Sequence, residues 1–216
     1  FGATGPFTNA SALMGAENLM RAVVKYPEEL HQLLRFTTAA MLQITKPFLE
    51  LGCNLGISEP MASGTLLSER NFRRFVLPYL QEYIRACRAM VDHPIKISMH
   101  ICGDTTQNLV AMAESGVDTL SLDNMVNLAD AKERIGDKVT ISGNVNPIDV
   151  MLGGTPETVE KAVKECFRKG WGSPKGFVIC TGCDTPMYAP FENIDAYMAA
   201  ARKCAKYPVN PAVFAE

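Results

Sequence analysis

The chain has 216 residues, of which 47% are hydrophobic, and its formal net charge is −2 at pH 7. It is long enough to bury a core, and it has no basic run, no secretory signal and no apolar stretch long enough to cross a bilayer. We therefore expect a cytoplasmic protein that binds neither nucleic acid nor membrane. The seven cysteines are an odd number and no export signal accompanies them, which favours reduced thiols and metal chemistry over a disulfide framework.

Short apolar runs alternate with longer helical patterns along the chain, which is typical of the strand and helix units of a parallel sheet. Six strands are predicted, over residues 1–7, 54–58, 95–99, 119–122, 139–142 and 177–180. Helices are predicted from Pro27 to before Gly52, from an N-cap at Ser68 to Met90, over 107–115, from Thr155 to Gly170 and from Pro190 to Lys203. Because proline disrupts helical hydrogen bonding, we expect Pro47 to bend or stop the first helix and Pro78 to bend the second.

No compositional break divides the chain, so we expect one α/β domain covering residues 1–216. A closed eight-stranded barrel needs ~250 residues, so six units fit a (β/α)8 TIM barrel that lacks its first quarter, with an open doubly wound sheet as the alternative. A six-stranded barrel fragment has two unpaired edges, which favours either a homo-oligomer or completion by the missing part. The barrel is preferred because polar residues that could take part in catalysis or metal binding lie at the carboxyl ends of successive strands, where barrel enzymes have their active sites. These residues are Glu59, His100, Cys102, Asp123, Asn144 and Cys183.

His100 and Cys102 form the pattern with the clearest chemistry. They lie two residues apart, so in an extended chain their side chains point to the same face and can share a metal ion. Cys183 follows a different strand and supplies a third candidate ligand. One imidazole and two thiolates select zinc over magnesium or calcium, and three protein ligands are typical of a catalytic zinc site. The alternative is a buried histidine beside a small apolar cysteine.

Glu59 comes directly after an apolar strand and before Pro60. This position suits the mouth of a barrel, where Glu59 could serve as a fourth ligand or a base, and the alternative is a solvated loop acid. Cys180 and Cys183 have the spacing of a redox motif, but Cys180 closes a strand instead of opening a helix, so we expect Cys180 to lie in the core. The remaining cysteines are interpreted as packing residues.

Several segments together resemble the uroporphyrinogen decarboxylase superfamily in order and spacing across essentially the whole chain. They are GPFTNASALMG, EPMASGTLLSERNFRRFVLPYL, HICGDT, TLSLDNMVNLADAKERIG, ISGNVNPIDVML and TGCDTPMYAPFENIDAYMAAA. Within that superfamily, the His-x-Cys-Gly segment and the later Gly-Cys are similar to those of the zinc-dependent corrinoid methyltransferases, of the methylcobamide:coenzyme M type. Decarboxylases of the superfamily carry a histidine in a Gly-His-Gly turn where Cys183 stands here, and they need no metal.

The resemblance implies a (β/α)8 barrel of more than three hundred residues, of which this chain is the C-terminal two thirds. It implies a zinc site, for which His100, Cys102 and Cys183 are the predicted ligands. From their places after strands we expect a catalytic role for Glu59, as a ligand that exchanges or as the group that receives the thiol proton, and we expect Asp123 and Asn144 to shape the substrate pocket. The implied activity is methyl transfer from a methylated corrinoid, carried by a partner protein, to a small thiol or similar acceptor.

Two other functions stay open from the sequence. One is metal-free decarboxylation of a tetrapyrrole, as in uroporphyrinogen decarboxylase, and the other is a non-catalytic barrel that binds a corrinoid or a protein partner. Glu59, Asn146 and Pro47 depart from the usual pattern of the superfamily, which leaves the methyl acceptor open.

Overall fold

The structure, a computed structural model, describes residues 1–215 and divides into two compact units, Phe1–Leu120 and Ser121–Glu216. The first unit contains β1 (Gly2–Thr4), α1 (Pro6–Met14), α2 (Ala16–Lys25), α3 (Pro27–Glu50), β2 (Leu55–Ser58), the short helix η1 (Pro60–Ala62), α4 (Glu69–Phe75), α5 (Leu77–Ala89), β3 (Ile97–Ile101), η2 (Thr106–Asn108) and α6 (Leu109–Ala113). The strand β4 (Thr119–Leu122) spans the division. The second unit continues with α7 (Leu128–Ile135), β5 (Thr140–Ser142), η3 (Pro147–Leu152), α8 (Pro156–Gly170), β6 (Phe177–Val178), α9 (Phe191–Cys204) and η4 (Pro211–Phe214).

Within each unit, strands that follow one another along the chain pair in parallel. In the first unit β1 pairs with β2 and β2 with β3, in a register that sets Ser58 beside His100. In the second unit β5 pairs with β6, and an isolated bridge between Val145 and Thr181 extends this pairing beyond the two strands. Parallel pairing brings the carboxyl ends of neighbouring strands to the same edge of the sheet, so the loops that follow them lie together.

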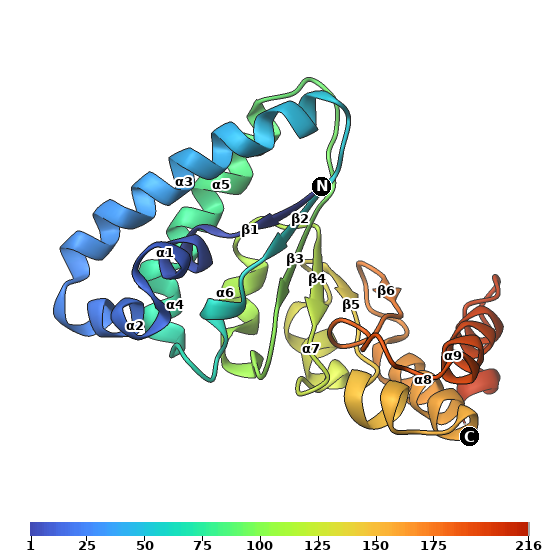
Figure 1. The fold of residues 1–216 in the computed structure, drawn as a ribbon. Helices are drawn as coiled ribbons and strands as arrows, with labels where there is room; N and C mark the ends of the chain where they lie inside the picture. Colours follow the sequence, from blue (N-terminus) through green and yellow to red (C-terminus); the bar gives the residue numbers. More distant parts are fainter. Residues whose placement is uncertain (216) are drawn as a thin grey trace. The chain divides into compact units, whose positions relative to one another are not determined.

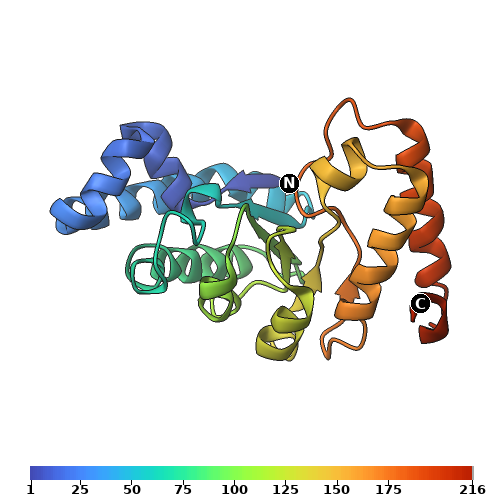
Figure 2. The same ribbon diagram turned by 90° about the horizontal axis from the view of Figure 1, so that it is seen from below.

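Apolar side chains of the strands and helices form the core of each unit. In the first unit α3 lies beside α5 (Figure 1), and between them the hydroxyls of Thr45 and Tyr83 lie 2.5 Å apart. In the second unit α8 lies beside α9, as both ribbon views show (Figures 1 and 2). Thr155 begins α8 with a capping box shared with Thr158, which satisfies backbone N–H groups that have no partner inside the helix.

The alternation of strands and helices expected from the sequence is confirmed, and several boundaries differ. The first predicted strand is wrong beyond Thr4, because Pro6 and Phe7 open α1, where a proline in the first turn is well tolerated. The helices α1, α2 and α7 were not predicted. Pro47 does not stop α3, which continues to Glu50.

The predicted helix from Ser68 to Met90 is two helices, α4 and α5. Ser68 caps α4 as expected, since its hydroxyl accepts a hydrogen bond from the backbone N–H of Asn71 at 3.4 Å. The helix is interrupted at Val76, which ends α4 and precedes α5. Pro78 lies in the first turn of α5, where a backbone N–H would have no partner inside the helix, so its absence loses no hydrogen bond.

Among residues 1–215, no helix combines the length and the apolar character that a membrane span requires. The expectation of a single barrel domain over residues 1–216 stays a prediction.

Candidate metal centre

His100 and Cys102 lie at the carboxyl end of β3. Along this strand Ile97, Met99 and Ile101 are buried and the residues between them are half-buried, so the side chains alternate between two faces as the sequence predicts. His100 and Cys102 fall on the same face, and the Cys102 Sγ lies 3.2 Å from the His100 Nε2. The predicted pairing of an imidazole and a thiol is therefore present within the first unit.

The separation of these two atoms fits a shared zinc ion. Tetrahedral zinc with a nitrogen at ~2.1 Å and a sulfur at ~2.3 Å sets those donors about 3.6 Å apart. The observed 3.2 Å between the Cys102 Sγ and the His100 Nε2 is reached from that value by a small side-chain rotation. Both residues are half-buried, so the neighbouring structure restrains their side chains while a metal ion can still reach them from solvent. A nitrogen and a sulfur donor together favour zinc over the oxygen-seeking ions.

Cys183 belongs to the second unit, in the loop that follows β6. The loop is fixed by backbone hydrogen bonds, among them Gly182 N to Val145 O at 2.8 Å, and by the Thr181 hydroxyl, which donates to the Cys183 carbonyl at 2.7 Å. A side chain at position 182 would clash with the backbone of Asn124, so only glycine fits before Cys183. Cys183 is half-buried. Its participation with His100 and Cys102 in one metal site stays a prediction.

Glu59 is fully buried, so the alternative of a solvated loop acid is wrong. Its carboxylate accepts hydrogen bonds from the backbone N–H groups of Thr8 at 2.5 Å and Phe7 at 3.3 Å. These are orphan donors of the first turn of α1, where an anion is stabilised by the helix dipole. Burial nevertheless outweighs these bonds and raises the pKa of the Glu59 carboxyl to about 7.

Glu59 also adjoins the histidine through the backbone. Its N–H donates to the His100 carbonyl at 2.9 Å, which continues the pairing of β2 with β3. Gly5 lies against the carboxylate so closely that a Cβ at position 5 would occupy the place of its oxygen. Glu59 therefore holds the beginning of α1, the end of β2 and the end of β3 in one arrangement, and its charge is adjustable near neutral pH.

Asp123 and Asn144 lie together in the second unit, as expected for residues at the ends of neighbouring strands. The Asn144 amide donates to the backbone carbonyls of Asp123 at 2.8 Å and Val126 at 2.7 Å, and both residues are buried. The Asp123 carboxylate accepts from the backbone N–H of Met125 at 3.1 Å. Asn144 thus fixes the loop after β4, and the role of both residues toward a substrate stays a prediction.

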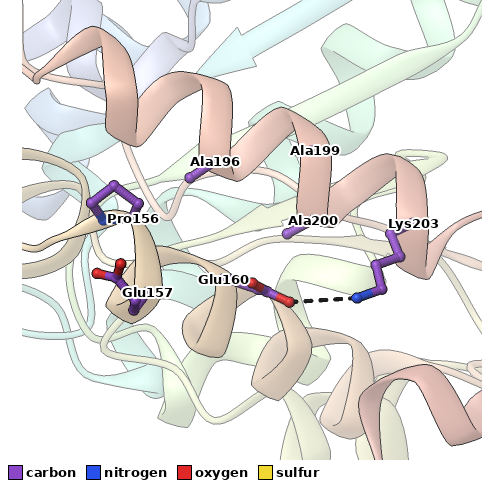
Figure 3. A pocket seen from close by; sticks show the side chains of 7 residues that line it. All are labelled: Pro156, Glu157, Glu160, Ala196, Ala199, Ala200 and Lys203. Atoms are coloured by element: carbon purple, nitrogen blue, oxygen red, sulfur yellow. Dashed lines mark ion pairs between the residues drawn. The ribbon is translucent and has the colours of Figure 1, made fainter.

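Two pockets lie within the second unit. One, of about 240 Å³, is lined by Asn124, Met125, Val126, Asn127, Leu128, Asn144, Glu165, Cys166 and Lys169. The other is a groove of about 330 Å³ between α8 and α9, floored by alanines and crossed by an ion pair between Glu160 and Lys203 at 3.7 Å (Figure 3). Asn144 lines the first pocket, and none of the predicted site residues lines the groove.

The other cysteines are mostly packing residues, as expected. Cys87, Cys166 and Cys204 are buried, and burial raises the pKa of each thiol. Cys180 differs from the prediction, since it is half-buried and its sulfur accepts a hydrogen bond from the Ser142 hydroxyl at 3.1 Å. The chain just after β6 is therefore more exposed to solvent than the prediction of a core position for Cys180 implied.

Comparison with known proteins gives a consistent assignment. The family model described as Uroporphyrinogen decarboxylase (URO-D) matches residues 2–204. The methylated-thiol–coenzyme M methyltransferase of Methanosarcina mazei is 31% identical over 201 residues, which are 93% of this chain and 52% of that protein. The methylcobamide:CoM methyltransferase of Methanosarcina barkeri is 28% identical over 201 residues, 92% of this chain and 56% of that protein. The uroporphyrinogen decarboxylase of Methylobacillus flagellatus is matched as well, at 28% identity over 81% of this chain and 48% of that protein.

A solved structure of a methyltransferase from Methanosarcina mazei aligns with a TM-score of 0.79 and 29% identity, covering 93% of this chain and 57% of that one. The chain thus spans about half the length of the relatives that it matches. The likeness extends over strands and helices of both units, which confirms the predicted α/β fold of the uroporphyrinogen decarboxylase type. The chain belongs to the uroporphyrinogen decarboxylase (URO-D) family.

Proposed function

We propose that the protein is a zinc-dependent methyltransferase that moves a methyl group from a methylated corrinoid, carried by a partner protein, to a small thiol or similar acceptor. The observation that carries the proposal is the 3.2 Å approach of the Cys102 sulfur to the His100 imidazole at the end of β3. A nitrogen and sulfur donor pair at that position suits zinc. The relatives include a methylated-thiol–coenzyme M methyltransferase and a methylcobamide:CoM methyltransferase.

His100, Cys102 and Cys183 are proposed to hold the zinc ion. A zinc ion bound there would supply positive charge, which lowers the pKa of an acceptor thiol and keeps it in the thiolate form at neutral pH. The protein's own contribution is to fix the donors at the ends of paired strands: His100 lies within β3, Cys102 follows β3, and Cys183 lies in the loop after β6. The corrinoid protein is proposed to dock over the carboxyl ends of the strands, since its methyl group has to come within ~3 to 3.5 Å of the acceptor sulfur.

Glu59 is proposed to hold or release a proton during the reaction. A carboxyl with a pKa of about 7 exchanges a proton readily at neutral pH, which an exposed glutamate does not. The Glu59 Oε1 already accepts a hydrogen bond from the Thr8 N–H at 2.5 Å, so the protonated and ionised forms are both held in a fixed position. Asp123 and Asn144 are proposed to shape the substrate pocket through the loop that Asn144 anchors.

Decarboxylation of a tetrapyrrole is the second candidate function. It is favoured by the uroporphyrinogen decarboxylases among the relatives. The paired His100 and Cys102 argue against it, because metal-free decarboxylation has no use for a thiol held beside an imidazole.

The proposal is tested by metal analysis of the purified protein beside the variants Cys102→Ala and Cys183→Ala, with Cys53→Ala as the matched control. Cys53 is also a half-buried cysteine, and it lies in the turn between α3 and β2. We expect about one zinc per chain in the wild type and the control, and a clear loss in the other two variants. Full zinc occupancy in both ligand variants would contradict the site.

The activity is tested on the full-length protein with methylcobalamin as the donor and a small thiol as the acceptor. We expect methyl transfer that disappears on chelation and returns with added zinc. Undiminished transfer in a verified metal-free preparation would contradict the zinc-dependent reaction, and release of carbon dioxide from a tetrapyrrole by the same preparation would favour the decarboxylase.

A further inference from the structure

Two loops of the first unit lie against each other next to the proposed ligands. One follows β2 and runs from Glu59 to Leu67, and the other follows β3 and runs from Cys102 to Asn108. The Gln107 side chain donates to the Gly64 carbonyl at 2.5 Å, and the Asn108 side chain donates to the Leu67 carbonyl at 3.4 Å. A Cβ at position 64 would clash with the carbonyl of Asp104, so the loops touch backbone to backbone.

Ser63 of the first loop lies next to Gly103 of the second. Gly103 follows Cys102 directly and has a φ of +79°, a conformation that side chains with a Cβ rarely adopt. A Cβ at position 103 would lie 2.9 Å from the Ser63 Oγ. Ser63 is itself confined, since it is 5% exposed and its hydroxyl lies 3.0 Å from that of Thr65. The confined Ser63 hydroxyl therefore limits how far the turn at Gly103 can move toward the loop after β2.

The direction of the Cys102 side chain depends on this turn. A tetrahedral metal site tolerates errors of only ~0.2 Å in its ligand distances, so a small shift of the Cys102 backbone changes affinity. His100 is held separately, because its carbonyl accepts from the Glu59 N–H at 2.9 Å within the strand pairing. A movement of the turn at Gly103 would thus displace the sulfur relative to the imidazole and change the 3.2 Å separation between them.

We propose that Ser63 is a positioning residue for Cys102: packed against Gly103, it holds the Cys102 thiol in line with His100 for metal binding. The inference rests on the proposed function, in which these two residues hold zinc. It assigns a role to the loop after β2 that neither the ligand motif nor the family assignment contains.

The first test replaces the glycine. Gly103→Ala introduces a methyl group against Ser63, while Gly52→Ala is the matched control, because Gly52 has a nearly equal φ of +82° and nothing within 4 Å of a Cβ. Both variants should lose thermal stability through the same backbone strain, and Gly103→Ala should lose more because its methyl group also meets Ser63. Only Gly103→Ala should lose affinity for Co²⁺ in a competition titration, by about 10- to 100-fold as for other residues that orient ligands. The cobalt-to-thiolate absorption band should weaken with it.

A second pair of variants avoids glycine strain. Ser63→Ala removes the confined hydroxyl, and Ser68→Ala is the control, because the Ser68 hydroxyl caps α4 by accepting from the backbone N–H of Asn71. We expect a several-fold weaker Co²⁺ affinity for Ser63→Ala and an unchanged one for Ser68→Ala. Adding Ser63→Gly to Gly103→Ala should restore part of the lost affinity, since the clash is removed.

The outcomes separate this inference from the proposed function. A wild-type protein without a cobalt-to-thiolate band overturns the proposed function and the inference with it. A wild type that shows the band, with Gly103→Ala equal to Gly52→Ala and Ser63→Ala equal to Ser68→Ala in Co²⁺ affinity, overturns the inference alone. Loss of affinity confined to Gly103→Ala and Ser63→Ala supports it, whatever acceptor the enzyme uses.

Discussion

Replacing Glu59 by glutamine tests whether a buried carboxyl at the start of α1 titrates near neutral pH. The glutamine has nearly the same shape and its oxygen still accepts the hydrogen bond that the Thr8 N–H donates to Glu59 at 2.5 Å. It has no ionised form, so the variant removes the pH dependence of this group while preserving most of the packing. The variant is best studied in metal-free protein, where only proton binding is compared.

The magnitude follows from the raised pKa. Burial raises the pKa of Glu59 from 4.5 to about 7. Below pH 4.5 the carboxyl is protonated in both the folded and the unfolded chain, and between pH 4.5 and 7 the unfolded chain ionises first. The stabilising contribution is therefore present at low pH and is lost as the pH rises through 7. Between pH 5 and 8 the free energy of unfolding should fall by roughly 2.5 kcal/mol from this group.

Urea denaturation at several pH values between 5 and 8 measures this loss. The difference in unfolding free energy between Glu59→Gln and the wild type should shift in favour of the variant across that range. Glu29→Gln, which changes an exposed glutamate of α3, is the control and should follow the wild type. Parallel pH profiles for Glu59→Gln and the wild type would refute the reasoning.

Three further predictions concern packing, anchoring and metal. Gly5→Ala forces a methyl group onto the Glu59 carboxylate and should cost about 2 kcal/mol of unfolding free energy, whereas Gly2→Ala, which meets nothing within 4 Å, should cost little of it. Asn144→Ala leaves two backbone carbonyls of the loop after β4 without their donor and should cost about 2 kcal/mol in the same urea measurement. Free zinc at 100 times its dissociation constant should stabilise the folded protein by about 2.7 kcal/mol, and a chelator should reverse this shift in a thermal melt.

The sequence by itself determined the repeating order of strands and helices and the pair of candidate ligand residues, His100 and Cys102, at the end of β3. Both depend on local chemistry. The alternation of Ile97, Met99 and Ile101 fixes which face of the strand His100 occupies, and the two-residue spacing then sets Cys102 on the same face. The helix starts predicted at Ser68 and Thr155 are confirmed for the same reason, because an N-cap side chain bonds to a backbone N–H within the first turn.

The start of the chain shows where local signals failed. Residues 1–7 were predicted as one strand, but only Gly2–Thr4 pairs with β2, and Pro6 begins a helix whose first N–H groups face Glu59. The helix start is stabilised by a carboxylate more than fifty positions away in the sequence, and no local pattern contains that contact. The packing of Ser63 against Gly103 was not predicted for the same reason, because these residues are forty positions apart in the sequence.

Tertiary structure also decided the chemical state of Glu59. From the sequence its carboxyl could be a solvated loop acid, a ligand or a base, because the residue type does not specify its surroundings. Folding buries it beneath α1, and burial disfavours the charged form more than two backbone hydrogen bonds favour it, so its pKa rises. The identity of a donor atom is a property of the sequence, whereas the solvent around it and the distance to its neighbour exist only in the folded chain.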